Sequence, residues 1–220
     1  MTKRIFGIIG CGGFGREVLP IVEQNLASEI SAGVSSVTYV LEDHYPPVSR
    51  DGRPVLRLSE FAKVPGEKYY CIAIADGRTR ARIDALCKSL DLRPFDVRSP
   101  QSSVSASCSV GEGSIIAPFA LISVNARIGR SLHLNYYACI THDCVVGDFV
   151  TFGPRAQCNG GVVIEDGVYI GAGALIKDAQ PGAPIVIGRN AVIGMGAVVL
   201  RSVEPNTVVV GNPARLLSRA

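Results

Sequence analysis

Residues 122–152 read ISVNAR-IGRSLH-LNYYAC-ITHDCV-VGDFVT-F, and every six-residue step begins with an apolar side chain. The same frame extends from Val104 to Ile176 without a slip. The residue after each apolar position is mostly small or polar, as at Ser123 and Gly129. The thirteen apolar positions are Val104, Val110, Ile116, Ile122, Ile128, Leu134, Ile140, Val146, Phe152, Cys158, Ile164, Ile170 and Ile176.

A period of six matches neither the 3.6-residue period of a helix nor the two-residue period of an amphipathic strand. It matches a chain that turns a corner every six residues, with the apolar side chain pointing to the axis and small residues easing the bend. Three steps close a triangular coil, so residues 104–180 predict about four coils of a parallel β-helix. The frame breaks at residues 177–186, predicted to be a protruding loop, and resumes at Ile187 for about two more coils.

The chain has 220 residues, 47% of them hydrophobic, which is enough for two small domains with their own cores. We place an N-terminal domain at residues 1–98 and the repeat domain at residues 99–220. The seven cysteines form no CxxC pair, and three occupy inward repeat positions, so we predict reduced core residues of a cytoplasmic protein. No apolar run reaches the length of a membrane span, and a net charge of +3 argues against nucleic-acid or membrane partners.

Strands and helices alternate in residues 1–98, which predicts a Rossmann-like parallel sheet with ligands at the carboxyl ends of its strands. We expect strands at residues 4–9, 37–41, 69–75 and 94–97, and helices at residues 16–26 and 79–90. Glycines follow the first apolar run where an export signal would have a cleavage site, so this run predicts a strand. The loop after it, Gly10-Cys11-Gly12-Gly13-Phe14-Gly15, has the pattern G-x-G-x-x-G.

Between a strand and a helix, the amides of such a loop can hold a pyrophosphate. The motif alone suggests NAD, but about 95 residues hold only one mononucleotide-sized half of the doubly wound fold. The nucleotide portion of a nucleotide-linked substrate fits this space better, with Glu42 and Asp43 placed to meet a ribose or a base edge. A tight turn without a ligand is the alternative. Asp51-Gly52-Arg53-Pro54 reads as a surface turn.

Three histidines are the candidate acid–base groups. His44 lies in a loop beside Tyr45-Pro46-Pro47, where it is either solvated or in contact with nucleotide. His133 occupies the last place of its step, predicted to be a turn, and we interpret it as structural or solvated. His142, next to Asp143, is predicted to occupy an outward-facing strand position midway along the β-helix, where neighbouring prisms would meet.

Three segments together resemble a known family: residues 10–15 (GCGGFG), 141–147 (THDCVVG) and 211–215 (GNPAR). They are similar to the hexapeptide-repeat sugar acyltransferases. More narrowly, they resemble the two-domain bacterial enzymes that acetylate amino groups on nucleotide-linked sugars, such as UDP-N-acetylbacillosamine and GDP-perosamine N-acetyltransferases. A branch of sialic acid O-acetyltransferases shares the layout. The resemblance covers nearly the whole chain, and its most specific part is the pairing of the glycine loop with the His-acidic step.

The resemblance implies a left-handed β-helix, a homotrimer with active sites at the subunit boundaries, and acetyl-CoA as co-substrate without a metal. The catalytic histidine of the family corresponds to His142 and its acidic neighbour to Asp143, where some members carry Glu. The nucleotide contacts correspond to Gly12, Gly13, Phe14 (His in some members), Glu42, Asp43 and Ala75, and a substrate-contacting asparagine to Asn135. The acetyl-CoA contacts correspond to Thr151, Gly171, Ala172, Gly194 and Met195, although Gly171 and Gly194 also suit plain coil geometry.

These features predict acetyl transfer from acetyl-CoA to the amine of a nucleotide-linked sugar. His142 would accept the proton that the amine loses, and Asp143 would stabilise the charged imidazole or select its tautomer. Direct transfer without an acyl-enzyme is expected, because Cys144 lies on an inward-facing position. The alternatives are O-acetylation of a sugar hydroxyl, a zinc enzyme that combines His133 and His142 of neighbouring chains, and a non-catalytic nucleotide-sugar- or NAD-binding protein.

Overall fold

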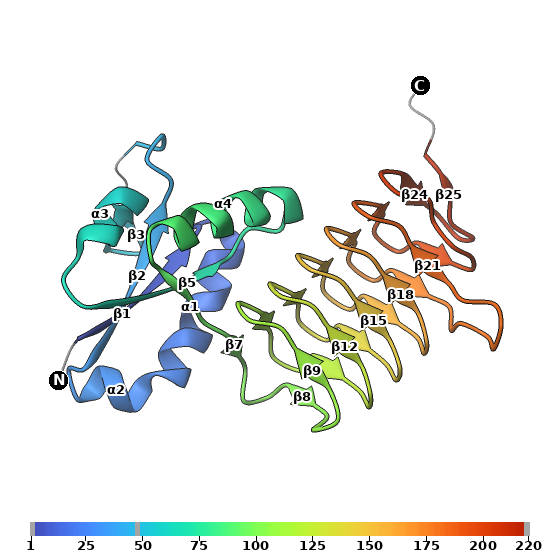
Figure 1. Cartoon of the computed structure of the whole chain (residues 1–220), viewed down its shortest axis with the longest axis horizontal. Coiled ribbons are helices and arrows are strands. Elements are labelled where there is room, and N and C mark those ends of the chain that lie inside the picture. The colour runs from blue at the N-terminus through green and yellow to red at the C-terminus, as the bar shows by residue number, and fades with distance from the viewer. Residues whose placement is uncertain (1–2, 47–48, 218–220) are drawn as a thin grey trace.

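The computed structural model describes residues 3–46 and 49–217, with an α/β domain at one end of a long β-helix (Figure 1). The N-terminal sheet has the strand order β3-β4-β2-β1-β5-β6 and is parallel except for the β3–β4 hairpin, which confirms the predicted Rossmann-like sheet. Its elements are β1 (Arg4–Ile9), α1 (Gly13–Asn25), α2 (Ala27–Ser31), β2 (Ser35–Leu41), β3 (Ser49–Arg50), β4 (Arg53–Arg57), α3 (Leu58–Lys63), β5 (Glu67–Ile72), α4 (Gly77–Ser89) and β6 (Arg93–Pro94).

Several elements of this domain differ from the prediction. Helix α1 begins at Gly13, three residues early, because the glycine loop leads directly into it. Strand β5 ends at Ile72, so residues 73–75 form a loop and not the end of a strand. The elements α2, β3, β4 and α3 are absent from the prediction. The predicted surface turn is the tip of the β3–β4 hairpin, where Asp51 and Gly52 both have positive φ, as a two-residue type I′ turn requires.

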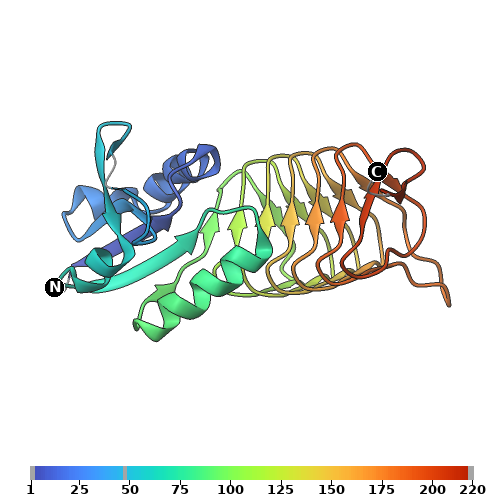
Figure 2. The ribbon, with the colours of Figure 1, turned by 90° about the horizontal axis from the view of Figure 1, so that it is seen from above.

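Three strands per coil build the predicted parallel β-helix, which extends away from the N-terminal domain as a prism (Figure 2). Its first side contains β7, β10, β13, β16, β19, β22 and β24, its second side β8, β11, β14, β17, β20 and β23, and its third side β9, β12, β15, β18 and β21. The strands are β7 (Val97–Arg98), β8 (Ser103–Val104), β9 (Ser109–Val110), β10 (Ile115–Ile116), β11 (Leu121–Ile122), β12 (Arg127–Ile128), β13 (His133–Leu134), β14 (Cys139–Ile140), β15 (Val145–Val146), β16 (Thr151–Phe152), β17 (Gln157–Cys158), β18 (Val163–Ile164), β19 (Tyr169–Ile170), β20 (Leu175–Ile176), β21 (Val186–Ile187), β22 (Val192–Ile193), β23 (Val198–Val199) and β24 (Val208–Val210).

The core of the prism is the stack of inward side chains that the hexads predict. From Ile116 to Ile176, every predicted inward residue is buried, whereas Val104 and Val110 in the first coil are only partly covered. Small side chains such as Ala138 and Ala156 fill the space beside the corners. Burying a Val, Leu or Ile contributes roughly 1.5–3 kcal/mol relative to leaving it exposed, so this stack dominates the stability of the domain.

The corners bend differently from the prediction. The left-handed residue lies three places after the inward residue, and it is often not glycine: Phe119, Tyr137, Asp143 and Arg155 all have φ near +60°. The small residue directly after the inward one has another purpose. A Cβ added at Gly111 would lie 2.5 Å from the backbone nitrogen of Arg130 in the next coil. Small residues there allow the coils to stack closely.

The C-terminal part completes the prism. Residues 177–185 leave the coil, as predicted, with a bridge between Gln180 and Ala183, and the coils then resume at β21. The chain closes with β25 (Arg215–Leu216), which pairs antiparallel with β24. Along residues 3–46 and 49–217, no helix combines the length and apolar character needed to cross a lipid bilayer.

A buried arginine joins the two domains. Arg80, on α4, is fully buried, and its guanidinium donates hydrogen bonds to six oxygens from both domains. The acceptors are the carbonyls of Ile74, Ala75, Ser131, Phe149 and Val150 and the hydroxyl of Thr151, at 2.6–3.3 Å. Burial lowers the pKa of Arg80 to about 9, which leaves it charged at neutral pH. Because these partners lie up to 71 residues away in sequence, α4 is fastened to the β-helix.

Candidate active site

His142 lies at a corner and not on a strand. It occupies the turn between β14 and β15, where the second and third sides of the prism meet, and its side chain is 60% exposed. The next residue, Asp143, adopts the left-handed conformation (φ 59°), which turns the chain and places the two side chains side by side. The prediction of an outward-facing strand position is therefore wrong in detail, although the outward direction is correct.

Three neighbours determine the orientation of the imidazole. His142 Nδ1 lies 2.8 Å from Asp143 Oδ2, and Asn125 Nδ2 donates to Asp143 Oδ1 at 3.1 Å. These contacts, first the one with His142, hold the pKa of Asp143 below its usual value. The ring also packs on Gly160 of the next coil, where an added Cβ would lie 2.5 Å from Nε2.

This arrangement suits a general base. An ionised Asp143 accepts a hydrogen bond, so Nδ1 carries the proton and the lone pair is on Nε2. The His142 side chain is 60% exposed, so a bound amine can approach the imidazole and give up a proton to it. The sequence analysis did not identify Asn125. It lies one 18-residue coil before Asp143, and that spacing is a signal from which the contact can be found.

The second part of the site is a pocket of about 680 Å³ at the carboxyl ends of the N-terminal strands. The predicted residues Gly12, Gly13, Phe14 and Glu42 all line it. The other lining residues are Ile9, Gly10, Cys11, Leu41, Tyr45, Pro46, Arg50, Ala73, Ile74 and Thr79. The sequence analysis missed Arg50 and Thr79, because their approach to the glycine loop depends on how the sheet is assembled.

The two adjacent carboxylates at the end of β2 have different positions. Arg82 binds both oxygens of Glu42, at 2.6 and 2.9 Å, and this contact lowers the pKa of Glu42. Asp43 does not line the pocket. Its carboxylate accepts a hydrogen bond from the backbone amide of Ser59 in the first turn of α3, at 3.0 Å. Asp43 therefore helps to cap α3, and its contact with a nucleotide stays a prediction.

His133 is buried at the domain junction, in strand β13, and not in a turn as predicted. Its Nε2 lies 2.8 Å from the carbonyl oxygen of Ile72, and its ring lies 5.0 Å from the ring of Phe14. Burial, with the nearby Arg80 guanidinium, holds the pKa of His133 well below its usual value. Its Nδ1 is also buried and has no hydrogen-bond partner among the described residues.

Two further residues of the predicted site, Thr151 and Ala75, form hydrogen bonds within the same domain junction. The Thr151 hydroxyl donates to the carbonyl oxygen of Ala75 at 2.8 Å and accepts from Arg80. Thr151 is buried, and its hydroxyl joins the two domains. That it contacts acetyl-CoA stays a prediction. The carbonyl of Ala75 has the same function, and Ala75 does not line the glycine-loop pocket.

The remaining predicted residues lie at corners between the first and second sides. Asn135 is largely buried, and its Nδ2 donates to the carbonyl oxygen of Phe152 at 2.7 Å. Met195 is 80% exposed, and Ala172 is exposed as well. A Cβ added to Gly171 would lie 2.6 Å from the backbone nitrogen of Met195. A Cβ added to Gly194 would lie 2.7 Å from the side chain of Val210. Coil stacking alone therefore accounts for both glycines.

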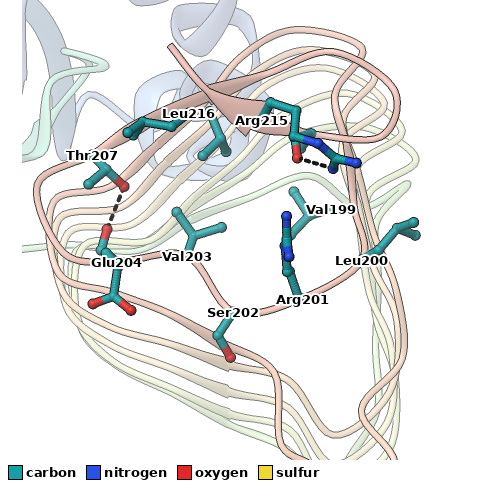
Figure 3. A pocket seen from close by; sticks show the side chains of 11 residues that line it. Val199, Leu200, Arg201, Ser202, Val203, Glu204, Thr207, Arg215 and Leu216 are labelled. Carbon is teal, nitrogen blue, oxygen red and sulfur yellow. Dashed lines mark hydrogen bonds between the residues drawn. The ribbon is translucent and has the colours of Figure 1, made fainter. Parts of the chain in front are cut away.

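A smaller cavity of about 240 Å³ opens at the C-terminal end of the prism (Figure 3). Its lining includes the buried Val199 and Val203, the exposed Leu216, and two arginines, Arg201 and Arg215. Arg215 donates to the carbonyl oxygen of Ala214 at 3.0 Å. None of the predicted site residues lines this cavity.

The geometry does not support the zinc alternative. His133 faces the N-terminal domain from the first side of the prism, whereas His142 lies at the opposite corner. Within residues 3–46 and 49–217, no three His, Cys, Asp or Glu side chains gather as a metal site requires. A site shared between chains would need His133 to leave its buried position.

Comparison with known proteins finds relatives for both domains of the chain. The model of the bacterial transferase hexapeptide family (six repeats) matches residues 143–178, and the model of the PglD N-terminal domain matches residues 6–84. The chain is 42% identical over 217 residues to the GDP-perosamine N-acetyltransferase of Escherichia coli O157:H7, which covers 98% of this chain and 97% of that protein.

Solved structures are similar to this chain over nearly its whole length. The structure of WeeI from Acinetobacter baumannii AYE is similar with a TM-score of 0.92 and 39% identity, over 98% of this chain and 100% of that chain. The acetyltransferase domain of PglB from Neisseria gonorrhoeae FA1090, in complex with acetyl coenzyme A, has a TM-score of 0.81 and 25% identity. The match covers 98% of this chain and 100% of that chain. The chain belongs to the family of hexapeptide-repeat nucleotide-sugar N-acetyltransferases.

Proposed function

We propose that this protein transfers the acetyl group of acetyl-CoA to the amino group of a nucleotide-linked amino sugar, such as GDP-perosamine or a UDP-4-amino sugar. The observation that carries the proposal is the His142–Asp143–Asn125 arrangement, which orients an exposed imidazole in a chain with a nucleotide-sized glycine-loop pocket. The Escherichia coli relative is named for GDP-perosamine, so that sugar is the first to test.

In the proposed reaction the neutral amine attacks the thioester carbonyl, and His142 Nε2 accepts the proton that the amine loses. Asp143 stabilises the imidazolium and holds Nδ1–H in place. Transfer is direct. Cys144 is the nearest thiol in sequence, and a hydrogen bond from Cys158 lowers its pKa to about 7, but its side chain is fully buried in the core. A thiol without access to the thioester does not form an acyl-enzyme.

The proposal includes a homotrimer, because one chain does not bring the two halves of the site together. The pocket residue Phe14 packs against His133 on the first side of the prism, whereas His142 occupies the corner opposite that side. Apolar side chains are exposed beside the second side, where Phe119 and Tyr137 stack at 5.0 Å. A neighbouring copy covering this face would place its pocket near His142.

The substrate assignment is tested with purified protein, acetyl-CoA and a panel of GDP-, UDP- and dTDP-linked amino sugars. We expect free CoA to be released with one nucleotide class and mass spectrometry to show an N-acetylated sugar. If only a sugar hydroxyl is acetylated, the enzyme is an O-acetyltransferase. If nucleotides bind but no CoA is released, the protein is a binding protein. An acetylated protein under single turnover would refute direct transfer.

The shared site is tested by mixing two inactive variants, His142→Asn and Gly13→Glu. Each site would combine the pocket of one chain with the histidine of the next, so random mixed trimers would regain about one quarter of the intact sites. Mixtures that remain inactive, although native mass spectrometry shows mixed trimers, would place pocket and base in one chain. The matched control is a mixture of the His142→Asn variant with the double variant.

A further inference from the structure

The β3–β4 hairpin brings an arginine to the glycine-loop pocket. The hairpin extends the sheet beyond β2, and its strands pair Arg50 directly with Arg53. Residues directly opposite each other in an antiparallel pair have neighbouring side chains, and like charges there are destabilising. Arg53 has a partner, since its guanidinium lies 2.8 Å from Glu23 Oε1 of helix α1. That ion pair fastens the hairpin to the helix whose first turn forms the pocket wall.

Arg50 has no such partner. Among the described residues it forms no ion pair, and its Nε is buried without a hydrogen-bond acceptor. A buried guanidinium nitrogen without an acceptor is costly. The Nε atoms of Arg57 and Arg80 are also buried without an acceptor, but of these three arginines only Arg50 lines the glycine-loop pocket, where a ligand can supply one. Arg50 is the only basic residue that lines the pocket within the described chain.

The rest of the pocket favours an anion at the same place. Helix α1 begins at Gly13, its N-cap residue Gly12 provides no side-chain cap, and its first turn contains no acidic residue. The amides of this turn are therefore available to a ligand, and the helix dipole favours negative charge. The single carboxylate in the lining, Glu42, is neutralised by Arg82.

We infer that Arg50 binds the diphosphate of the nucleotide-linked substrate, holding it against the first turn of α1. This inference rests on the proposed function, and it assigns the phosphate contact to a hairpin outside the glycine motif. Arg50 thereby recognises any nucleoside diphosphate by its charge, and base selection resides elsewhere in the pocket. A guanidinium suits this contact because its planar donors match two phosphate oxygens at once.

The experiment measures the affinities of the full-length protein for GDP, GMP, guanosine, UDP, UMP and uridine by calorimetry. Arg50→Gln is compared with Arg50→Lys and with Arg93→Gln, an exposed arginine in β6 at the opposite edge of the same sheet. We expect Arg50→Gln to weaken diphosphate binding about 10- to 100-fold, as for loss of a charge-assisted hydrogen bond, and to leave nucleoside binding unchanged. Arg50→Lys should fall between, and Arg93→Gln should bind like the wild type.

In acetyl transfer, Arg50→Gln should raise KM for the nucleotide sugar while kcat at saturation stays the same. Equal losses for guanosine and GDP, or an unchanged GDP affinity with wild-type melting temperature, would overturn the inference. Those results would leave the proposed function intact if the wild type acetylates an amino sugar. Conversely, Arg50-dependent diphosphate binding without acetyl transfer would overturn the proposed function and support the phosphate contact.

Discussion

Two histidines nine residues apart occupy opposite environments in the same prism. His133 lies in a strand on the side that the N-terminal domain covers, with its ring buried between Ile72 and Phe14. His142 lies at a corner on the far side, exposed, with its ring held by Asp143 and Gly160. Both side chains point away from the axis, but His133 is the last residue of its hexad and His142 the third. The repeat frame does not tell which side of the prism the N-terminal domain covers.

The difference between them shows how this scaffold separates stability from chemistry. Burial lowers the pKa of His133 and so keeps its ring neutral in the domain junction. A neutral, buried ring does not exchange protons near neutral pH. Exposure leaves His142 accessible to a ligand, and the contacts around it orient the ring without covering it. Changes on the junction side should therefore affect folding, and changes at the corner should affect catalysis.

The largest effect is expected for His142→Asn. Loss of a general base lowers the rate by about 10²–10⁴-fold, so kcat/KM for acetyl transfer should fall by that factor. The melting temperature should not change, because the side chain is exposed. A variant that keeps wild-type kcat/KM would show that His142 is not the general base.

On the junction side, Arg80→Met should destabilise the protein by roughly 3 kcal/mol, measured by urea unfolding. The substitution keeps most of the side-chain length but leaves six buried oxygens without their donor. The matched control is Arg93→Met, an exposed arginine in β6, which should have no measurable effect. If both variants are equally stable, the buried arginine does not hold the domains together.

Gly160→Ala tests whether the position of the His142 ring matters for catalysis. The added methyl group would displace the His142 ring, and a shift of about 1 Å in a catalytic group costs up to roughly 100-fold in rate. We expect kcat to fall about 10- to 100-fold with little change in melting temperature, because the ring can move into solvent. Combined with His142→Asn, the substitution should cause no further loss, since the two act on the same group. Additive losses would show that Gly160 acts elsewhere.

The smallest effect concerns pH. The pKa of His133 is depressed in the folded protein, so below pH 6.5 the unfolded chain binds a proton that the folded protein does not. Stability from this group is therefore present above pH 6.5 and is lost as pH falls, by about 1.4 kcal/mol per pH unit. Unfolding of the wild type and of His133→Gln at pH 5.5–7.5 should show this difference in slope. Parallel curves would mean that His133 titrates normally.

The parts of the site that the sequence predicts are local or periodic. Asp143 follows His142 directly, the glycine loop is continuous, and Asn125 precedes Asp143 by one coil, so its contact also follows from the repeat. The burial of the inward residues follows from the hexads for the same reason. In a β-helix, neighbours across coils are a constant number of residues apart, and a sequence period translates directly into contacts.

Apart from the Asn125 contact, the contacts that the sequence analysis missed join segments far apart in the chain. Thr151 meets Ala75 across 76 residues, and His133 meets Ile72 across 61. Whether His133, Thr151 or Arg80 is buried depends on which side of the prism the N-terminal domain covers, and no periodicity encodes that. The outward positions are alike until the docking of α4 makes one side the interior.

The sequence by itself thus determines the β-helix, the glycine loop and the pairing of His142 with Asp143, since each depends on residues adjacent or one coil apart. Only the tertiary structure decides that Asp43 caps a helix, that Thr151 joins the domains and that Arg50 reaches the pocket. The positions of Asp43 and Arg50 depend on how the N-terminal sheet is assembled, and that of Thr151 depends on how this domain packs on the prism. The physical reason is that contacts within the repeat join residues a constant, short distance apart in the sequence. Contacts between sheet strands and between domains join residues far apart, and no periodicity specifies them.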